Sequence, residues 1–136
     1  MSKRIVVWGT GFVGRMVIAE IVKHPSFDLV GVGVSNPEKV GRDVGEICGL
    51  GAPIGLTATD DVDALIALKP DAVVHYGPTA AHADDNIALI TRFLRAGVDV
   101  CSISMTPWVW PKMHLNPPNW IQPITEACEL GGSSCF

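Results

Sequence analysis

This sequence of 136 residues lacks the marks of several protein classes. No run approaches the ~20 consecutive apolar residues of a membrane-spanning helix, and no signal-peptide pattern opens the chain. We therefore expect a cytoplasmic protein that makes no contact with membranes. The four cysteines form no Cys-x-x-Cys pair and the four histidines show no metal-ligand spacing, so no metal site is expected. His75, at the end of an apolar run, is expected to be satisfied or solvated rather than a ligand.

The sequence also lacks a surplus of positive charge. Ten Lys and Arg residues stand against 14 Asp and Glu residues, which gives a net charge of −4 at pH 7. Proteins that bind the phosphates of nucleic acids normally show a basic surplus, so no nucleic-acid partner is expected. Apolar residues, in contrast, make up 48% of the chain, which suits a parallel sheet buried on both faces. The length fits one domain with its own core.

Apolar runs alternate with segments of helical spacing along most of the chain. Strands are expected at 4–8, 29–34, 72–76 and 98–103, with a short one at 56–58 and an extended segment at 133–136. Helices are expected at 12–23, 62–68, 80–96 and 123–130, with a short helix within 37–48. Strands that alternate with helices, without hairpin signals, indicate an α/β fold with right-handed crossovers in a doubly wound parallel sheet.

A glycine pattern, Gly9-x-Gly11-x-x-Gly14, lies between the first predicted strand and the first predicted helix. In a Rossmann dinucleotide-binding domain the first glycine permits a tight turn, the second lets a pyrophosphate approach the backbone, and the third lets the helix lie close to the strand. The positive end of the helix dipole then assists phosphate binding. The alternative is a glycine turn that only connects. Contacts with the cofactor are assigned to the whole turn: Gly9, Thr10, Gly11, Phe12, Val13 and Gly14.

The end of the second predicted strand bears on the choice between NADP and NAD. NAD-binding folds usually place Asp or Glu there, but this sequence has Ser35 and Asn36. Without a carboxylate to repel it, a 2′-phosphate could be received by these two side chains, with Lys39 or Arg42 supplying positive charge. NADP is therefore the expected cofactor and NAD the alternative. Lys39 and Arg42 could equally belong to a solvated helix face.

Two further segments are candidates for contact with ligands. Tyr76, Gly77, Pro78 and Thr79 follow the strand at 72–76, at the carboxyl edge where ligands of open α/β sheets bind. Their backbone is expected to flank the nicotinamide ribose, although a plain strand-to-helix turn with Thr79 as a cap fits as well. Residues 106–122 are rich in proline and tryptophan and fit neither period. The loop at 107–111 could be the wall of a substrate pocket or a dimer contact.

The motifs WGTGFVGR, VSNPEKVGRD, VVHYGPTA, VDVCSIS and ITEACELGG occur here in this order. Together they resemble the N-terminal domain of the dihydrodipicolinate reductase-like superfamily, and within it the NAD(P)-dependent amine dehydrogenases and 2,4-diaminopentanoate dehydrogenase. The resemblance covers residues 3–136. It implies a homodimeric oxidoreductase that transfers hydride between nicotinamide and a carbonyl, imine or amine carbon, as in the reductive amination of ketones or aldehydes.

The resemblance also implies a division of labour between domains. Residues 1–136 would be the NAD(P)-binding domain, with 104–136 leading toward a substrate domain that is not part of this chain and that would make the dimer. The 136-residue piece alone is then expected to be inactive.

One feature departs from the pattern expected of amine dehydrogenases. They are expected to carry a carboxylate shortly after the strand expected at 98–103, whereas this sequence has neither Asp nor Glu between Val100 and Thr125. Met105 and Thr106 occupy that region instead. No catalytic residue is therefore assigned. Two alternatives to an amine dehydrogenase stay open: a reductase of the dihydrodipicolinate type, and a module that binds or senses NAD(P) without turnover.

Overall fold

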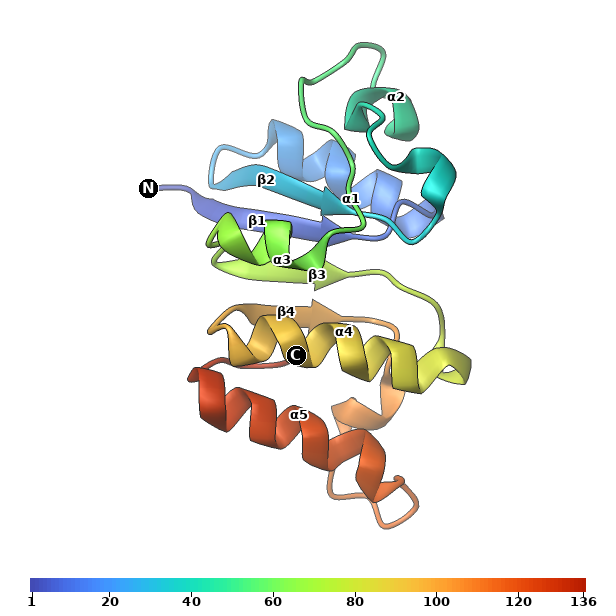
Figure 1. The fold of residues 1–136 in the computed structure, drawn as a ribbon, viewed down its shortest axis with the longest axis vertical. Coiled ribbons are helices and arrows are strands. Elements are labelled where there is room, and N and C mark those ends of the chain that lie inside the picture. Colours follow the sequence, from blue (N-terminus) through green and yellow to red (C-terminus); the bar gives the residue numbers. More distant parts are fainter.

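A parallel sheet of four strands, in the order β2-β1-β3-β4, forms the centre of the molecule (Figure 1). The computed structural model describes residues 1–136, apart from the side chain of Ala80. The strands are β1 (Lys3–Trp8), β2 (Phe27–Gly33), β3 (Ala72–His75) and β4 (Asp99–Ser102). All four point to the right in Figure 1, so their carboxyl ends meet at one edge. The register places Trp8 between Gly33 and His75 at that edge.

Helices cover both faces of the sheet. The helices are α1 (Phe12–Lys23), α2 (Val44–Cys48), α3 (Val62–Ala67), α4 (Ala83–Arg95) and α5 (Pro118–Gly131), with short 3₁₀ segments η1 (Pro37–Lys39), η2 (Ala80–His82) and η3 (Thr106–Val109). Side chains alternate along β1: Ile5 and Val7 belong to a core with α1 and α2, whereas Val6 and Trp8 belong to a core with α3, α4 and α5. This arrangement confirms the predicted doubly wound α/β fold.

Residues 134–136 lie alongside β4 and continue the sheet. The Val100 amide donates to the carbonyl of Ser134 at 3.0 Å, and the Ser102 amide donates to that of Phe136 at 2.8 Å. Val100 and Cys135 form a parallel bridge. The prediction of an extended segment at the end of this sequence is therefore confirmed, and the crossover from β4 through α5 returns the chain parallel to β4.

The segment around 56–58 was wrongly predicted as a strand. The structure shows only isolated bridges there, from Thr57 to Asp43 and from Thr59 to Gly33. Just before this segment, the Asp43 carboxylate accepts hydrogen bonds from the amides of Gly45 at 2.7 Å, Ile54 at 3.0 Å and Gly55 at 2.8 Å and fixes the loop. Residues 56–59 themselves are held by backbone bonds to two different segments, from the Val44 amide to the Leu56 carbonyl at 2.8 Å and from the Thr59 amide to the Val32 carbonyl at 3.0 Å, so no continuous ladder forms.

Three predicted helices have different bounds. The helix expected within 37–48 is two separate pieces, η1 and α2, and the one expected at 80–96 is η2 followed by α4. The helix expected from residue 123 begins at Pro118, so that Pro123 lies inside α5. Proline fits the first helical position, because its backbone angle suits the helix and the missing N–H would be unbonded there in any case. Pro118 therefore starts the helix that Pro123 was expected to start.

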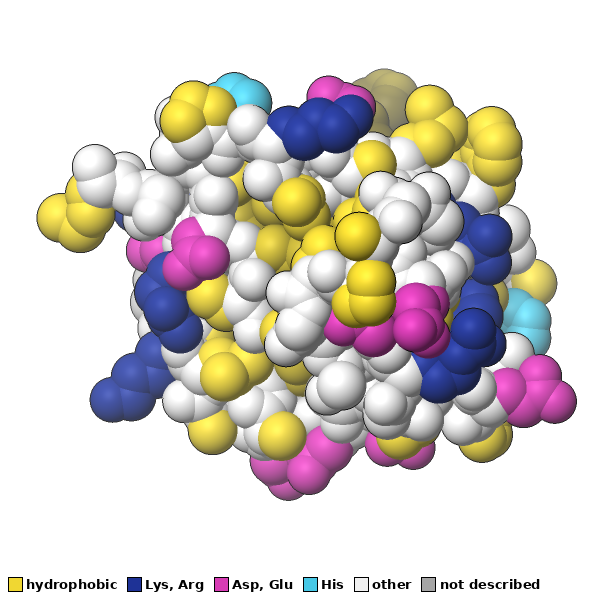
Figure 2. Space-filling view, turned by 90° about the horizontal axis from the view of Figure 1, so that it is seen from above, with side chains coloured by type: hydrophobic (Ala, Val, Ile, Leu, Met, Phe, Trp, Pro, Cys, Tyr) yellow, Lys and Arg dark blue, Asp and Glu magenta, His cyan; other side chains and the backbone are white. Residues whose placement is uncertain are grey.

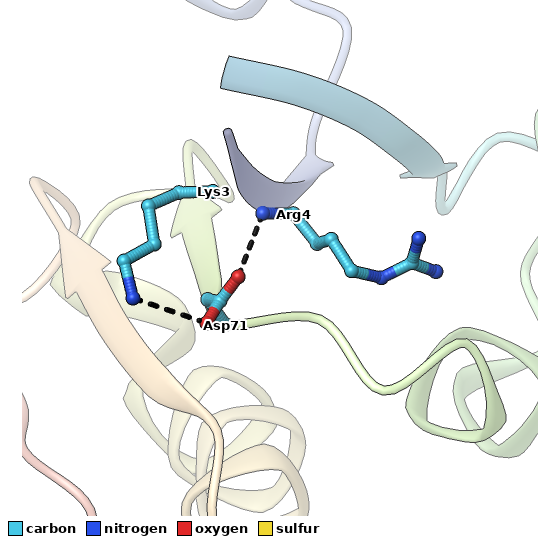
Figure 3. Close-up of polar contacts among 3 residues, drawn as sticks. All are labelled: Lys3, Arg4 and Asp71. Carbon is cyan, nitrogen blue, oxygen red and sulfur yellow. Dashed lines mark hydrogen bonds and ion pairs between the residues drawn. The ribbon is translucent and has the colours of Figure 1, made fainter. Parts of the chain in front are cut away.

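Asp71 joins the amino ends of β1 and β3, at the edge of the sheet opposite the carboxyl ends. Its carboxylate accepts hydrogen bonds from the Arg4 amide at 2.8 Å and from Lys3 Nζ at 3.3 Å (Figure 3). The hydrogen bond from the Arg4 amide, and to a smaller extent the one from the Lys3 side chain, holds the pKa of Asp71 below its ordinary value. The Arg4 side chain also donates to the carbonyl of Leu68 at 2.8 Å, so charged groups fasten this edge.

Asp71→Asn should lower the urea midpoint of unfolding at pH 7. A lowered pKa in the folded state means that the carboxylate stabilises the fold above its ordinary pKa of 3.8, and that this contribution is lost as the pH falls further. The variant should therefore differ from the parent at pH 7 and approach it at pH 3. The control is Asp63→Asn, which removes the exposed ion pair with Arg92 and should leave the midpoint unchanged. Equal effects of the two substitutions would contradict the role given to Asp71.

Candidate functional site

Two close backbone approaches build the turn between β1 and α1. Gly9 has a φ of +107°, and a Cβ at this position would lie 2.4 Å from the carbonyl oxygen of Tyr76. A Cβ at Gly14 would lie 2.0 Å from the carbonyl oxygen of Gly9. In both cases the obstacle is backbone, which cannot move aside as a flexible side chain can. The first turn of α1 therefore lies directly on the end of β1, as the glycine pattern predicts.

Gly11 has a different environment from its two neighbours in the motif. Its φ is −71°, and a Cβ there would meet no described atom within 4 Å. It is the N-cap of α1, so no cap side chain accepts a hydrogen bond from the N–H groups of the first turn, and that turn carries no acidic residue. The orphan N–H groups and the positive end of the helix dipole thus face open space, which is the arrangement that binds a phosphate. Phe12 and Val13, next in the turn, are exposed.

Two cationic side chains converge on Thr10, which is itself buried. Lys39 Nζ donates to Thr10 Oγ1 at 2.9 Å, and Arg15 Nε donates to the Thr10 carbonyl oxygen at 3.0 Å. Figure 2, which views the molecule from the side of β2 and α2, shows one group of Lys and Arg side chains on the right, the side toward which the strands point, and others on the left and at the top. Lys39 was predicted from the sequence; Arg15 was missed, although its place directly after Gly14 was a signal.

The other residues predicted to meet a 2′-phosphate lie around the same edge. Ser35 is exposed at the end of β2. Asn36 Oδ1 accepts a hydrogen bond from the Glu38 amide at 3.0 Å and so caps η1, which leaves the Asn36 amide nitrogen as the group that can donate to a phosphate. The side chain of Arg42 is exposed and makes no hydrogen bond to another described residue. The structure therefore brings Lys39, but not Arg42, onto the glycine turn.

A cleft of about 540 Å³ opens at the carboxyl edge between β1 and α4. Trp8 lies in it, and its ring crosses β2 at Gly33, where a Cβ would stand 1.9 Å from Trp8 Cε3. Ser35 and Pro78 lie at the two sides, so the cleft joins two segments that the sequence placed near a cofactor. Its size and mostly apolar lining suit a planar ring with a sugar attached. The lining is Trp8, Ser35, Val62, Pro78, His82, Asp85, Asn86, Ala88, Leu89 and Arg92.

The segment 76–79 is fastened by two buried side chains that sequence reasoning missed. Asn86 Nδ2 donates to the carbonyl of Pro78 at 2.9 Å, and Ser104 Oγ donates to that of Gly77 at 2.9 Å. The expectation that Thr79 caps a helix holds only for its carbonyl, which accepts from the His82 amide at 2.9 Å. The signal for Asn86 was a polar residue within the apolar stripe of α4, a position that it shares with Thr91.

His75 ends β3 directly below this segment and is 1% exposed. Its Nδ1 lies 2.9 Å from Ser102 Oγ, whereas its Nε2 has no hydrogen-bond partner among the described residues. Burial lowers the pKa of His75 to about 4, so the ring is neutral at pH 7. The expectation of a satisfied histidine is therefore only half right, because one ring nitrogen is bonded and the other is not.

The two tryptophans of the loop at 107–111 have different environments. Trp108 Nε1 donates to the carbonyl of Trp120 at 2.7 Å, which ties the loop to α5. Trp110 is 66% exposed. Asn116 Nδ2 donates to the carbonyls of Pro107 and Trp110 at 3.1 and 2.8 Å and holds the loop in shape. Trp110 is thus the tryptophan that could meet a substrate or a partner, and Trp108 is structural.

Residues 3–95 match the sequence family described as dihydrodipicolinate reductase, N-terminus. The chain belongs to this family. It is 42% identical over 132 residues to an amine dehydrogenase of Streptomyces virginiae, a match that covers 96% of this chain and 36% of that protein. The domain therefore spans just over a third of the length of that relative.

Solved structures share the fold. An amine dehydrogenase from Mycobacterium smegmatis matches with a TM-score of 0.78 and 24% identity, over 99% of this chain and 38% of that one. An engineered D-amino acid dehydrogenase bound to NADP⁺ matches with a TM-score of 0.65 and 19% identity, over 99% of this chain and 36% of that one. At these identities the likeness shows the fold alone.

Two kinds of feature are absent from the described residues of the domain. In the part of the chain that the structure describes, no helix combines the length and the apolar character needed to cross a bilayer. Among the same residues, His, Cys, Asp and Glu side chains nowhere form a group of three or more that could hold a metal ion.

Acid should destabilise the protein through His75. Its pKa is about 4 in the folded state against 6.5 ordinarily, so the unfolded chain takes up the proton first as the pH falls. The stability that the neutral His75 ring contributes is fully present above pH 6.5. It is lost as the pH falls toward 4, which lowers the free energy of unfolding by about 3 kcal/mol in all. Urea unfolding at pH 7.5 and 4.5 should show this loss, and His75→Phe should reduce the difference between the two. His114→Phe, at an exposed site, should leave the difference as in the parent; a parent-like difference in His75→Phe would refute the assignment.

Proposed function

We propose that this chain is the cofactor domain of an NADP-preferring oxidoreductase of the amine dehydrogenase type. The observation that carries the proposal is the turn 9–14, where Gly9 and Gly14 bring α1 against β1 and Gly11 leaves the backbone open to a ligand. A pyrophosphate would lie against the N–H groups of Gly11, Phe12 and Val13. The adenosine would enter the cleft beside Trp8, and the nicotinamide ribose would pass the segment 76–79.

The preference for NADP rests on the charges around the adenosine end. No carboxylate stands at the end of β2, where Ser35 and Asn36 lie instead. Lys39, held on Thr10 at 2.9 Å, and Arg15 supply two positive charges beside the turn. A phosphate attached to the adenosine 2′ position would be attracted there, and Arg42 is a third cation within the same segment. NAD stays the alternative.

The reaction that we propose for the whole protein is hydride transfer between nicotinamide and a carbonyl, imine or amine carbon. Its support is the 42% identity with a protein named as an amine dehydrogenase. The bound nicotinamide would supply or accept the hydride, while the residues of this chain bind and orient it. We further propose that residues 1–136 are the cofactor domain, that 104–136 lead toward a substrate domain, and that the protein is a cytoplasmic homodimer without a nucleic-acid partner.

A reductase of the dihydrodipicolinate type is the second candidate. It is favoured by the family match and by the lack of any Asp or Glu between Val100 and Thr125, where an amine dehydrogenase is expected to have a carboxylate. The intact protein with NADPH should be assayed with a panel of ketones, with and without ammonia, and with an unsaturated cyclic dicarboxylate. Ketone turnover that needs ammonia supports the amine dehydrogenase, turnover of the cyclic acid alone supports the reductase, and binding without turnover supports a sensing module.

Gly11→Asp should abolish dinucleotide binding without unfolding the protein. The fold should tolerate the change because a Cβ at Gly11 meets no described atom within 4 Å and its φ is −71°. Binding should fail because a carboxylate would then occupy the place of the pyrophosphate. Calorimetric titration with NADPH measures the effect. Ser26→Asp adds the same charge beyond the other end of α1 and should bind as the parent does. If Gly11→Asp keeps its affinity, the phosphate assignment is wrong.

Asn36→Asp should reverse the preference between cofactors. Asp keeps an oxygen to cap η1 but adds a negative charge where the 2′-phosphate would lie, so affinity for NADP should fall by about ten- to a hundredfold while NAD is spared. Lys39→Ala should act in the same direction at low salt and lose its effect at high salt. The ratio of the two dissociation constants is the quantity to measure, with Lys112→Ala as a distant control. A parent that prefers NAD, or an unchanged ratio in Asn36→Asp, would disprove the NADP assignment.

A further inference from the structure

A chain of hydrogen bonds runs from His75 to the backbone of Gly77, two residues further along. Ser102 Oγ lies 2.9 Å from His75 Nδ1 and accepts a hydrogen bond from the Ser104 amide at 3.2 Å. Ser104 Oγ in turn donates to the carbonyl oxygen of Gly77 at 2.9 Å. His75 and Ser104 are 1% and 8% exposed, so the chain lies beneath the surface of the candidate site. Residues from the ends of β3 and β4 thereby fix one peptide group of the loop between β3 and η2.

The ring of His75 also sets how deep Gly77 can lie. A Cβ at Gly77 would stand 2.5 Å from His75 Nε2 and 3.2 Å from Asn86 Oδ1, so the backbone of Gly77 is enclosed between the imidazole and the amide. No side chain larger than that of glycine fits there unless the ring moves. The carbonyl groups of Gly77 and Pro78 are drawn inward, to Ser104 Oγ and to Asn86 Nδ2 respectively. Three buried contacts therefore fix the position of this loop: the His75 ring and the hydrogen bonds from Ser104 and Asn86.

Stability alone does not account for a histidine at this place. A buried polar nitrogen without a partner costs free energy, whereas an apolar ring of similar size would fill the same space without that cost. The Nε2 of His75 is such a nitrogen among the described residues. Burial holds the pKa of the ring at about 4, so at pH 7 it contributes shape and one hydrogen bond rather than charge.

We propose that His75 is a positioning residue, which acts through Ser102 and Ser104 to hold the Gly77 backbone where the nicotinamide half of the dinucleotide needs it. The inference rests on the proposed function, because it requires a dinucleotide whose nicotinamide end passes over residues 76–79. The adenosine half would be bound by other groups, namely the cleft beside Trp8 and the two cationic side chains that donate to Thr10. Loss of the His75 contacts should therefore weaken the binding of the nicotinamide half only.

The test compares two probes, NADPH and 2′-phospho-adenosine 5′-diphosphate, which lacks both the nicotinamide ring and the ribose that carries it. Ser104→Ala removes the hydroxyl that donates to Gly77 and should weaken NADPH binding about two- to tenfold, while the analogue binds as it does to the parent within about twofold. His75→Phe should show the same split. His75→Asn should restore NADPH affinity, because its amide can take the place of Nδ1 beside Ser102.

The matched control is Ser133→Ala, which also removes a hydroxyl that donates to a backbone carbonyl, that of Leu94 at 2.7 Å, at the opposite end of α4. Both probes should bind to it as to the parent. If Ser104→Ala and His75→Phe leave NADPH binding unchanged, or weaken both probes equally, the positioning role is overturned while the proposed function stands. If the parent binds neither probe, the proposed function itself fails. Should His75→Phe not fold, Ser104→Ala decides the question.

Discussion

The contact between Gly14 and the carbonyl of Gly9 is the constraint on which the rest of the site depends. Because a Cβ would come within 2.0 Å of that oxygen, α1 begins directly on the end of β1. Gly9 in turn lies against the backbone of Tyr76, because a Cβ at Gly9 would stand 2.4 Å from the carbonyl oxygen of Tyr76. The start of α1, the end of β1 and the segment after β3 thus form one backbone unit. The two ends of a dinucleotide would meet groups whose separation is set by backbone rather than by flexible side chains.

The two edges of the sheet are secured by different kinds of interaction. At the amino edge, Asp71 gathers an amide and an ammonium group in the presence of solvent, so the bonds there compete with water and salt. At the carboxyl edge, Asn86 and Ser104 are buried and neutral and donate to backbone carbonyls. Neutral buried bonds are little screened, and they hold the loop without placing a charge beside a ligand. A binding edge therefore keeps its shape over a wide range of ionic strength.

Local pattern predicted much of this fold and site, and contacts between distant segments account for what it missed. The turn 9–14 and the helix at 12–23 could be predicted because strand, glycines and helical spacing lie within twenty residues. The segment 56–58 could not, because its backbone bonds to residues 41–44, and to β2 only at Thr59, so that isolated bridges form in place of a strand. Asn86 and Ser104 show no role in the sequence, since their partners are carbonyls whose direction depends on the folded loop. Polar residues within apolar patterns were the signal that sequence reasoning left unused.

Trp8 gives the domain an optical property of its own. Its indole crosses Gly33, is 8% exposed and forms part of the cleft that we assign to adenosine. Indole emission responds to the polarity of its surroundings and to aromatic groups stacked nearby. An adenine that entered the cleft would therefore alter the fluorescence of this residue, while the other three tryptophans belong to a separate segment, 108–120, and supply a steady background. The same ring that spaces β1 from the helices would report, without any added label, whether the nucleotide is bound.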